Sequence, residues 1–188
     1  LAYAQGFSLV YSNCNGFADR ELPKLKAAGI PIAFDFSDRW TPDYLQATLP
    51  WVDIALLSCS HLPAGQREEV LAQALHLGAR IAVATAGQEG SWVLWEGKLF
   101  HAPAARAAQV VDTMGAGDAY FAAFLCSLLK TAGEEGLFAR DLSHRIPQAM
   151  GQAAAYAAQT CALEGAFGGG VTLAGRTELT PLEKDLSL

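Results

Sequence analysis

Four short apolar runs separated by helical stretches constrain the fold of this chain more than any other feature. The predicted strands are 7–11, 30–36, 52–57 and 80–85, and these runs lack polar alternation. Strands of a parallel sheet have this composition because helices cover both of their faces. Helices are predicted at 18–28 and 66–77, each followed by a glycine that favours a helix end, Gly29 and Gly78.

The second half of the chain adds a hairpin and two long helices. Residues 91–95 and 98–101 flank Glu96-Gly97, a dipeptide typical of a hairpin turn. Helices are predicted at 115–131 and 145–161. This order of elements predicts an α/β chain with a three-layer αβα, Rossmann-like fold, in which ligands bind at the carboxyl ends of the strands.

Charge and cysteine usage argue against several classes of function. The formal net charge is −6 and no lysine or arginine cluster is visible, so neither nucleic acid nor a membrane surface is an expected partner. No apolar run approaches the roughly 20 residues that span a bilayer, and no signal peptide is visible. The four cysteines form no CxxC pair, which favours a reduced cytoplasmic compartment over a disulfide framework or a zinc site.

The segment 110–121 carries the strongest chemical signal. Val110-Val111 is predicted as a strand that runs into the turn Gly115-Ala116-Gly117, where a helix begins. Free amides at a helix N-terminus, beside small residues, suit a phosphoryl group, and Asp118 in the first turn is placed to take a proton from an incoming hydroxyl. The alternative is helix capping, with Thr113 as N-cap and Asp118 favourable to the helix dipole. Capping does not account for two glycines flanking an alanine between two aspartates.

The stretch Asp112-Thr113-Met114-Gly115-Ala116-Gly117-Asp118 resembles D-T-x-G-A-G-D, the second signature of the PfkB/ribokinase family of carbohydrate kinases. The resemblance implies a ribokinase-like fold, an anion hole formed by Gly115, Ala116 and Gly117, and Asp118 as the catalytic base. It also implies that Thr113 lies at the nucleotide and that Asp112 lies near a monovalent cation such as K⁺.

Two further stretches match the family order. Thr85, Gly87 and Gly90 follow the fourth predicted strand and resemble the family's T-x-G-x-x-G nucleotide loop. Alone this motif is weak, because glycine-rich turns after strands are common. Gln152 stands where relatives often carry the Asn of a helix that borders adenine; the alternative is an alanine-rich helix that is merely tightly packed.

The chain also departs from the family pattern. Ser58-Cys59-Ser60-His61 replaces the usual N-x-x-E, whose Glu helps to organise magnesium. Mg²⁺ is still an expected cofactor together with ATP, because it keeps several waters and binds nucleotide phosphates. His61 is more typical of a solvent-facing loop residue than of a ligand.

The stretch 34–40 indicates which class of substrate accepts the phosphoryl group. It is similar to family members that phosphorylate sugar-amine adducts such as fructoselysine, and Asp35 and Asp38 are therefore candidate substrate residues. Both lie at the end of a predicted parallel strand, where ligands bind. The alternative is a strand-end turn in which Asp38 caps the next helix.

The resemblance implies an ATP-dependent kinase acting on a hydroxyl of a sugar or sugar-amine. Residues 1–167 are expected to form its C-terminal nucleotide-binding and catalytic part, and 168–188 a poorly ordered tail. The N-terminal strands and the lid of relatives, through which a homodimer is expected to form, are missing, so the chain alone is expected to be an incomplete catalyst. A non-catalytic nucleotide-binding or regulatory domain is the alternative. An NAD-binding domain is disfavoured because no strand precedes G-x-G-x-x-G with an acidic residue about 20 positions on.

Overall fold

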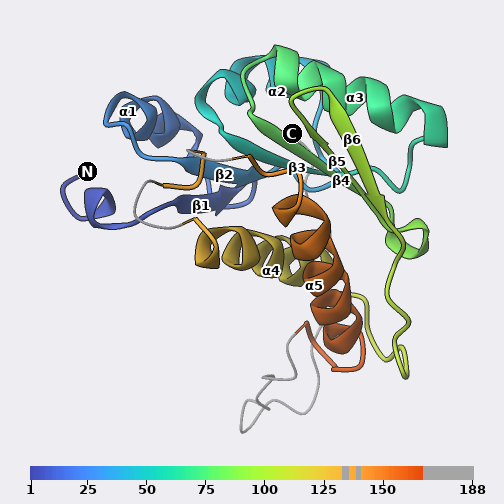
Figure 1. The fold of residues 1–188 in the computed structure, drawn as a ribbon. Helices are drawn as coiled ribbons and strands as arrows, with labels where there is room; N and C mark the ends of the chain where they lie inside the picture. Colours follow the sequence, from blue (N-terminus) through green and yellow to red (C-terminus); the bar gives the residue numbers. More distant parts are fainter. Residues whose placement is uncertain (133–135, 139–140, 167–188) are drawn as a thin grey trace, which may run out of the picture.

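The computed structural model describes residues 1–132, 136–138 and 141–166, so the predicted tail 168–188 lies outside the described residues. In this described part of the chain, six strands form one sheet in chain order (Figure 1). They are β1 (Val10–Asn13), β2 (Ile32–Asp35), β3 (Ile54–Ser58), β4 (Ile81–Thr85), β5 (Ser91–Trp95) and β6 (Lys98–Ala102). The strands β1 to β4 are parallel, and β5 is antiparallel to both β4 and β6. The predicted α/β fold and the hairpin are confirmed.

Helices cover both faces of this sheet, which gives three layers (Figure 1). One face carries α1 (Leu22–Ala27), α2 (Pro42–Thr48) and α3 (Ala64–His76), and the other carries α4 (Ala116–Lys130) and α5 (Arg145–Thr160). Short 3-10 helices lie at Ala4–Gly6 (η1), Asp19–Glu21 (η2), Leu49–Trp51 (η3) and Gly87–Glu89 (η4). No helix in the described part of the chain is long and apolar enough to cross a bilayer.

Two apolar cores lie on the two faces of the sheet because neighbouring residues of a strand point to opposite sides. In β3, Ile54 and Leu56 join the core under α4 and α5, whereas Ala55 and Leu57 join the core under α1, α2 and α3. All four residues are buried. The absence of polar alternation in the sequence therefore follows from burial on both faces.

Several predicted boundaries differ from the structure. The first strand begins at Val10 rather than at residue 7, and the helix predicted at 18–28 divides into η2 and α1. The strand predicted at Val110-Val111 is wrong: both valines are exposed in a loop, and the Val111 amide donates to the Cys161 carbonyl after α5 instead of to a strand.

Both capping alternatives that the sequence left open are wrong. The N-cap of α2 is Thr41, whose hydroxyl accepts from the Tyr44 amide at 3.2 Å, and not Asp38. The N-cap of α4 is Gly115, and no described side chain, Thr113 included, caps this helix. Helix α4 begins after a left-handed glycine, and among the described residues the amides of Gly117 and Asp118 have no backbone acceptor.

Candidate functional site

The turn that opens α4 brings small residues, free amides and a carboxylate together. Gly115 has a φ of 74°, and a Cβ on it would lie 2.7 Å from the Cβ of Ala166, so this position requires glycine. A Cβ on Gly117 would meet open space. Among the backbone hydrogen bonds of the described residues, none starts at the amides of Gly117 or Asp118. These amides, at the positive end of a 15-residue helix, are available to an anion.

Asp112 anchors this turn. Its Oδ1 accepts from the Met114 amide at 2.9 Å, and its Oδ2 accepts from the Gly165 amide at 3.2 Å. The carboxylate thus ties the start of the turn to the segment that follows α5. Thr113 is exposed, and its carbonyl accepts from the Ala116 amide at 3.2 Å.

Asp118 lies exposed in the first turn of α4 and faces the sheet. The hydroxyl of Tyr11, in β1, is 3.5 Å from Asp118 Oδ1. The ring of Tyr11 packs edge-on against Phe121, one turn further along α4, with centroids 5.6 Å apart. These contacts hold the N-terminal turn of α4 against the edge strand of the sheet.

Asp35, the last residue of β2, is the second carboxylate of this region. It is only 7% exposed, and its Oδ1 accepts from the Ser37 amide at 2.7 Å. Burial raises the pKa of Asp35 to about 6, and the negative charge of Asp118 adds to this, while the Ser37 amide opposes it. Burial, together with the charges of Asp35 and Asp118, also raises the pKa of Tyr11. Tyr11, Asp35 and Asp118 therefore form one electrostatically coupled group.

Asp38 does not join this group. Its side chain is exposed, and in the described part of the chain its carboxylate accepts only a 3.3 Å hydrogen bond from Ser37 Oγ. Of the two candidate substrate residues, the structure brings only Asp35 to Asp118.

The predicted nucleotide loop follows β4. Thr85 ends the strand, η4 spans Gly87–Glu89, and the Ala86 amide donates to the Gly90 carbonyl at 2.9 Å to close the turn. Gly90 has a φ of 96°, and a Cβ there would lie 2.1 Å from the Ala102 carbonyl oxygen. The close approach of β6 therefore dictates the second glycine of the motif.

The carboxyl ends of β3 and β4, and the residues that follow β2 and β3, are bonded to one another. The Ser58 amide donates to the Ser37 carbonyl at 2.8 Å, and the Cys59 amide donates to the Thr85 carbonyl at 2.7 Å. His61 packs against the ring of Trp40, with centroids 5.3 Å apart. Cys59 is fully buried, and burial raises the pKa of its thiol to about 11, so it stays protonated.

A cavity of about 400 Å³ lies between α5 and the loop that precedes the Gly115 turn. It is lined mostly by alanines, with one Arg and one Gln: Ala105, Arg106, Ala107, Ala108, Ala155, Ala158, Gln159 and Ala162. Gln152 is exposed on α5 and does not line it. Gln159 does, seven residues further along the same helix face. The amides of Val111 and Asp112 donate to the Cys161 carbonyl, which joins this cavity to the turn.

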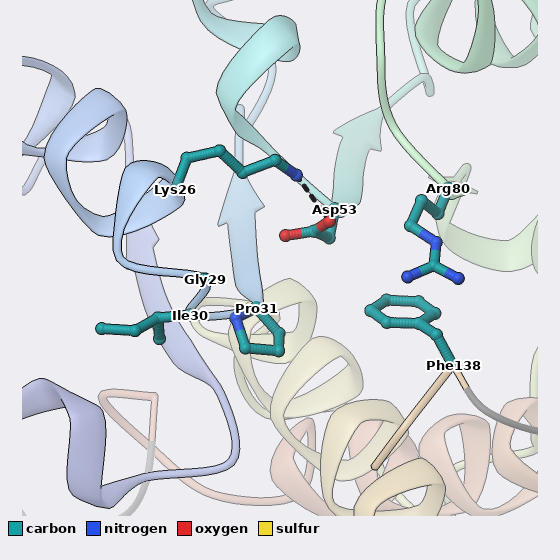
Figure 2. A pocket seen from close by; sticks show the side chains of 7 residues that line it. All are labelled: Lys26, Gly29, Ile30, Pro31, Asp53, Arg80 and Phe138. Carbon is teal, nitrogen blue, oxygen red and sulfur yellow. Dashed lines mark hydrogen bonds and ion pairs between the residues drawn. The ribbon is translucent and has the colours of Figure 1, made fainter. Parts of the chain in front are cut away.

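A second cavity, of about 240 Å³, lies at the amino ends of the parallel strands, opposite the end that carries Asp35 and the loops after β3 and β4 (Figure 2). It is lined by Lys26, Gly29, Ile30, Pro31, Asp53, Arg80 and Phe138, where β2, β3 and β4 begin. Lys26 is paired with Asp53 at 2.6 Å, and the guanidinium of Arg80 lies 3.8 Å above the Phe138 ring (Figure 2). None of the predicted site residues lines it.

Sequence reasoning missed two residues of the site region. Tyr11 was expected only as the end of a strand, and its contact with Asp118 joins residues far apart in the chain. Gln159 lacked a motif, because the other wall of its cavity comes from residues 105–108, which no local pattern links to α5.

Comparisons with known proteins agree with this arrangement. The pfkB family carbohydrate kinase profile matches residues 3–168. Fructoselysine 6-kinases of Shigella flexneri and of Escherichia coli (strain K12) are each 35% identical over 170 residues, covering 88% of this chain and 58% of theirs. Fructosamine kinase FrlD of Bacillus subtilis (strain 168) is 31% identical over 170 residues, covering 90% of this chain and 55% of the relative.

Solved structures show the same fold. Ribokinase from Giardia lamblia has a TM-score of 0.74 at 20% identity, covering 89% of this chain and 57% of that one. The microbiome-derived acarbose kinase Mak1 has a TM-score of 0.70 at 25% identity, covering 87% and 52%. The chain thus spans a little over half the length of the relatives it matches. The predicted family is confirmed by the profile match and by these identities: the chain belongs to the pfkB family of carbohydrate kinases.

Proposed function

We propose that this chain carries the nucleotide-binding and catalytic part of an ATP-dependent kinase that phosphorylates a hydroxyl of a sugar-amine. The observation that carries the proposal is the exposed Asp118 carboxylate at the start of α4. It lies beside the amides of Gly117 and Asp118, which donate to no backbone acceptor among the described residues. Amides at a helix N-terminus stabilise charge on a transferring phosphoryl group, and a neighbouring carboxylate accepts the proton of the attacking alcohol.

The proposed reaction is an in-line phosphoryl transfer. The acceptor oxygen attacks the γ-phosphorus, Asp118 takes the hydroxyl proton, and the bond to the bridging oxygen breaks with its electron pair passing to ADP. The turn Gly115-Ala116-Gly117 holds the γ-phosphate, with Thr113 beside it. The loop containing Thr85, Gly87 and Gly90 is proposed to lie along the phosphates of the nucleotide and to contact them.

The alanine-lined cavity beside α5 is the proposed site of the adenine ring. Its walls are mostly apolar, which suits a flat aromatic base, and Gln159 offers an amide to the ring edge. Gln152, which is exposed on α5, lies outside the lining of this cavity, and its contact with the nucleotide stays a prediction.

Magnesium is proposed to bind through the nucleotide phosphates and water. Among the described residues, no group of three or more His, Cys, Asp or Glu side chains is arranged to hold a metal ion unaided. Mg²⁺ prefers phosphate and water ligands to a protein cage, so the nucleotide would supply most of its ligands. Asp112 is proposed to shape a neighbouring K⁺ site by fixing the backbone at Met114 and Gly165.

The proposed acceptor is a fructoselysine-like sugar-amine, as the names of the relatives suggest. Asp35 suits this class because its buried carboxylate forms no ion pair in the described part of the chain and lies near Asp118. A protonated amine would supply the missing positive charge. Asp38, exposed and outside this group, is proposed to contact only the outer end of the acceptor.

Location and assembly are proposals as well. The four cysteines are all free, which suits a reducing cytoplasm. A homodimer is proposed for the whole protein. Its contacts would be made by the lid that the longer relatives carry. No observation favours a non-catalytic nucleotide-binding domain over the kinase.

The full-length protein, ATP, Mg²⁺ and fructoselysine provide the test, with ADP release as the readout. Asp118→Asn is expected to lower turnover about 10²–10⁴-fold, because it removes the proton acceptor, while ATP binding stays intact. Asp43→Asn is the matched control, since Asp43 is also exposed in the first turn of a helix. Unchanged turnover in the Asp118 variant would refute the assigned base.

A further inference from the structure

A buried guanidinium lies beneath the proposed nucleotide loop. Arg67, in α3, is only 3% exposed. Its two terminal nitrogens donate to the two carboxylate oxygens of Glu89 at 2.8 and 2.7 Å, a bidentate pairing. One of them also donates to the Leu62 carbonyl at 3.2 Å.

Two rings complete the surroundings of this pair. The guanidinium carbon of Arg67 lies 4.7 Å from the centre of the Trp92 ring, in cation–π contact. His101 stacks on Trp92 with centroids 4.6 Å apart, and its Nε2 is 3.3 Å from the Glu89 carbonyl oxygen. The side chain and the backbone of Glu89 are therefore both fixed, although its side chain is 58% exposed.

The contacts of Arg67 join two separate loops. Leu62 belongs to the loop after β3, where its amide donates to the Cys59 carbonyl at 3.1 Å. Glu89 ends η4, inside the proposed nucleotide loop after β4. One side chain thus fixes the position of one loop relative to the other.

Arg67 is not suited to bind phosphate itself. Its side chain is almost completely buried, and its charge is compensated by Glu89. A buried charge of this kind is costly unless it is paired, so the pair is kept closed. Its effect on a ligand must pass through the loops that it holds.

We propose that Arg67 is a positioning residue that holds the loop 85–90 in its nucleotide-binding shape and couples it to the loop after β3. The proposal rests on the nucleotide-binding role given above to Thr85, Gly87 and Gly90. A loop that is ordered before binding loses less conformational entropy when ATP arrives, so Arg67 contributes to ATP affinity and not to acceptor affinity.

Two variants of the full-length protein test this proposal. Arg67→Lys keeps the charge but loses the bidentate geometry, and Glu89→Gln removes the ion pair from its exposed side. Each is expected to raise the KM for ATP and the Kd of a non-hydrolysable ATP analogue roughly ten-fold. The KM for the acceptor, and kcat at saturating ATP, are expected to change less than about three-fold.

Loop order is measured separately by amide hydrogen exchange. Exchange at 86–90 is expected to accelerate in both variants without any nucleotide present, because the loop opens locally. The double variant is expected to cost little more than either single one, since both remove the same contact. Glu21→Gln is the matched control: it breaks the exposed Lys24–Glu21 pair, also 2.8 Å long, away from this loop.

The outcomes separate this proposal from the proposed function. Unchanged exchange at 86–90, or an equal rise of KM for ATP and for the acceptor, would overturn the positioning role. Failure of the wild-type protein to bind the ATP analogue would overturn the nucleotide role of the loop. Even if the wild-type protein does not bind the analogue, the hydrogen-exchange experiment would still show whether Arg67 orders the loop 85–90.

Discussion

At the scale of single residues, the surroundings of Asp35 disfavour its negative charge. The carboxylate is buried, accepts one amide hydrogen bond and lies near the negative charge of Asp118. Burial raises its pKa from 3.8 to about 6, so the folded protein binds this proton more tightly than the unfolded chain does. An uncompensated carboxylate of this kind is a cost that ligand binding can offset.

The pH dependence of stability follows from this shift. Between about pH 4 and pH 6 the folded state keeps the Asp35 proton that the unfolded state has lost, so stability from this group falls as pH rises through that window. Asp35→Asn is therefore expected to stabilise the ligand-free protein more at pH 8 than at pH 5, by a difference on the order of 1 kcal/mol. Urea unfolding at the two pH values measures this. Equal effects at both would contradict the pKa assignment.

At the scale of elements, the sequence predicted best those structures that depend only on the backbone conformation of adjacent residues. Glu96-Gly97 predicted the hairpin because both residues adopt positive φ, 47° and 73°, as a two-residue turn demands. Val110-Val111 failed because β-branched residues favour a strand only when a neighbouring strand is available, and here the Val111 amide meets the Cys161 carbonyl instead.

The candidate site divides in the same way. The glycines of the turn and Asp118 are contiguous in sequence, so a motif indicates them together. Tyr11 reaches Asp118 only through the docking of α4 on the edge strand, and no local pattern contains that information. Gln159 likewise lines a cavity whose other wall, 105–108, comes from a distant loop.

Gly90 gives the sharpest prediction for an element. Gly90→Ala would place a methyl carbon 2.1 Å from the Ala102 carbonyl oxygen at a φ of 96°, so the β5–β6 edge must shift. We expect a loss of stability of about 2–4 kcal/mol and weaker ATP binding, measured by urea unfolding and by titration with an ATP analogue. Gly65→Ala, in helix α3 with open space around it, is the control and is expected to change stability by less than about 1 kcal/mol. A tolerated Gly90→Ala would mean that β6 can move away from this turn.

At the scale of the whole molecule, one sheet separates two apolar cores that alternate along every central strand. Ile81 and Val83 of β4 face α4 and α5, while Ala82 and Ala84 face the helices on the other side. Neither core can lose its sheet wall without exposing the other. The two layers are therefore expected to unfold as a single cooperative unit, as small domains usually do.

A matched pair of cavity variants tests this cooperativity. Phe124→Ala opens the core under α4 and α5, and Leu71→Ala opens the core beneath α3; both side chains are fully buried. Each is expected to cost about 2–5 kcal/mol, whereas Leu99→Ala, exposed on β6, is expected to cost less than about 1 kcal/mol.

Tryptophan fluorescence and far-UV circular dichroism, followed together in urea, decide the outcome. Trp95 belongs to the core under α4 and α5, whereas Trp40 and Trp92 pack against the core under α1, α2 and α3. Fluorescence therefore reports on both faces of the sheet. Because either cavity weakens the shared sheet, both variants are expected to move the two signals to the same lower midpoint. Different midpoints for the two signals in either variant would show that the two helical layers do not unfold as one cooperative unit.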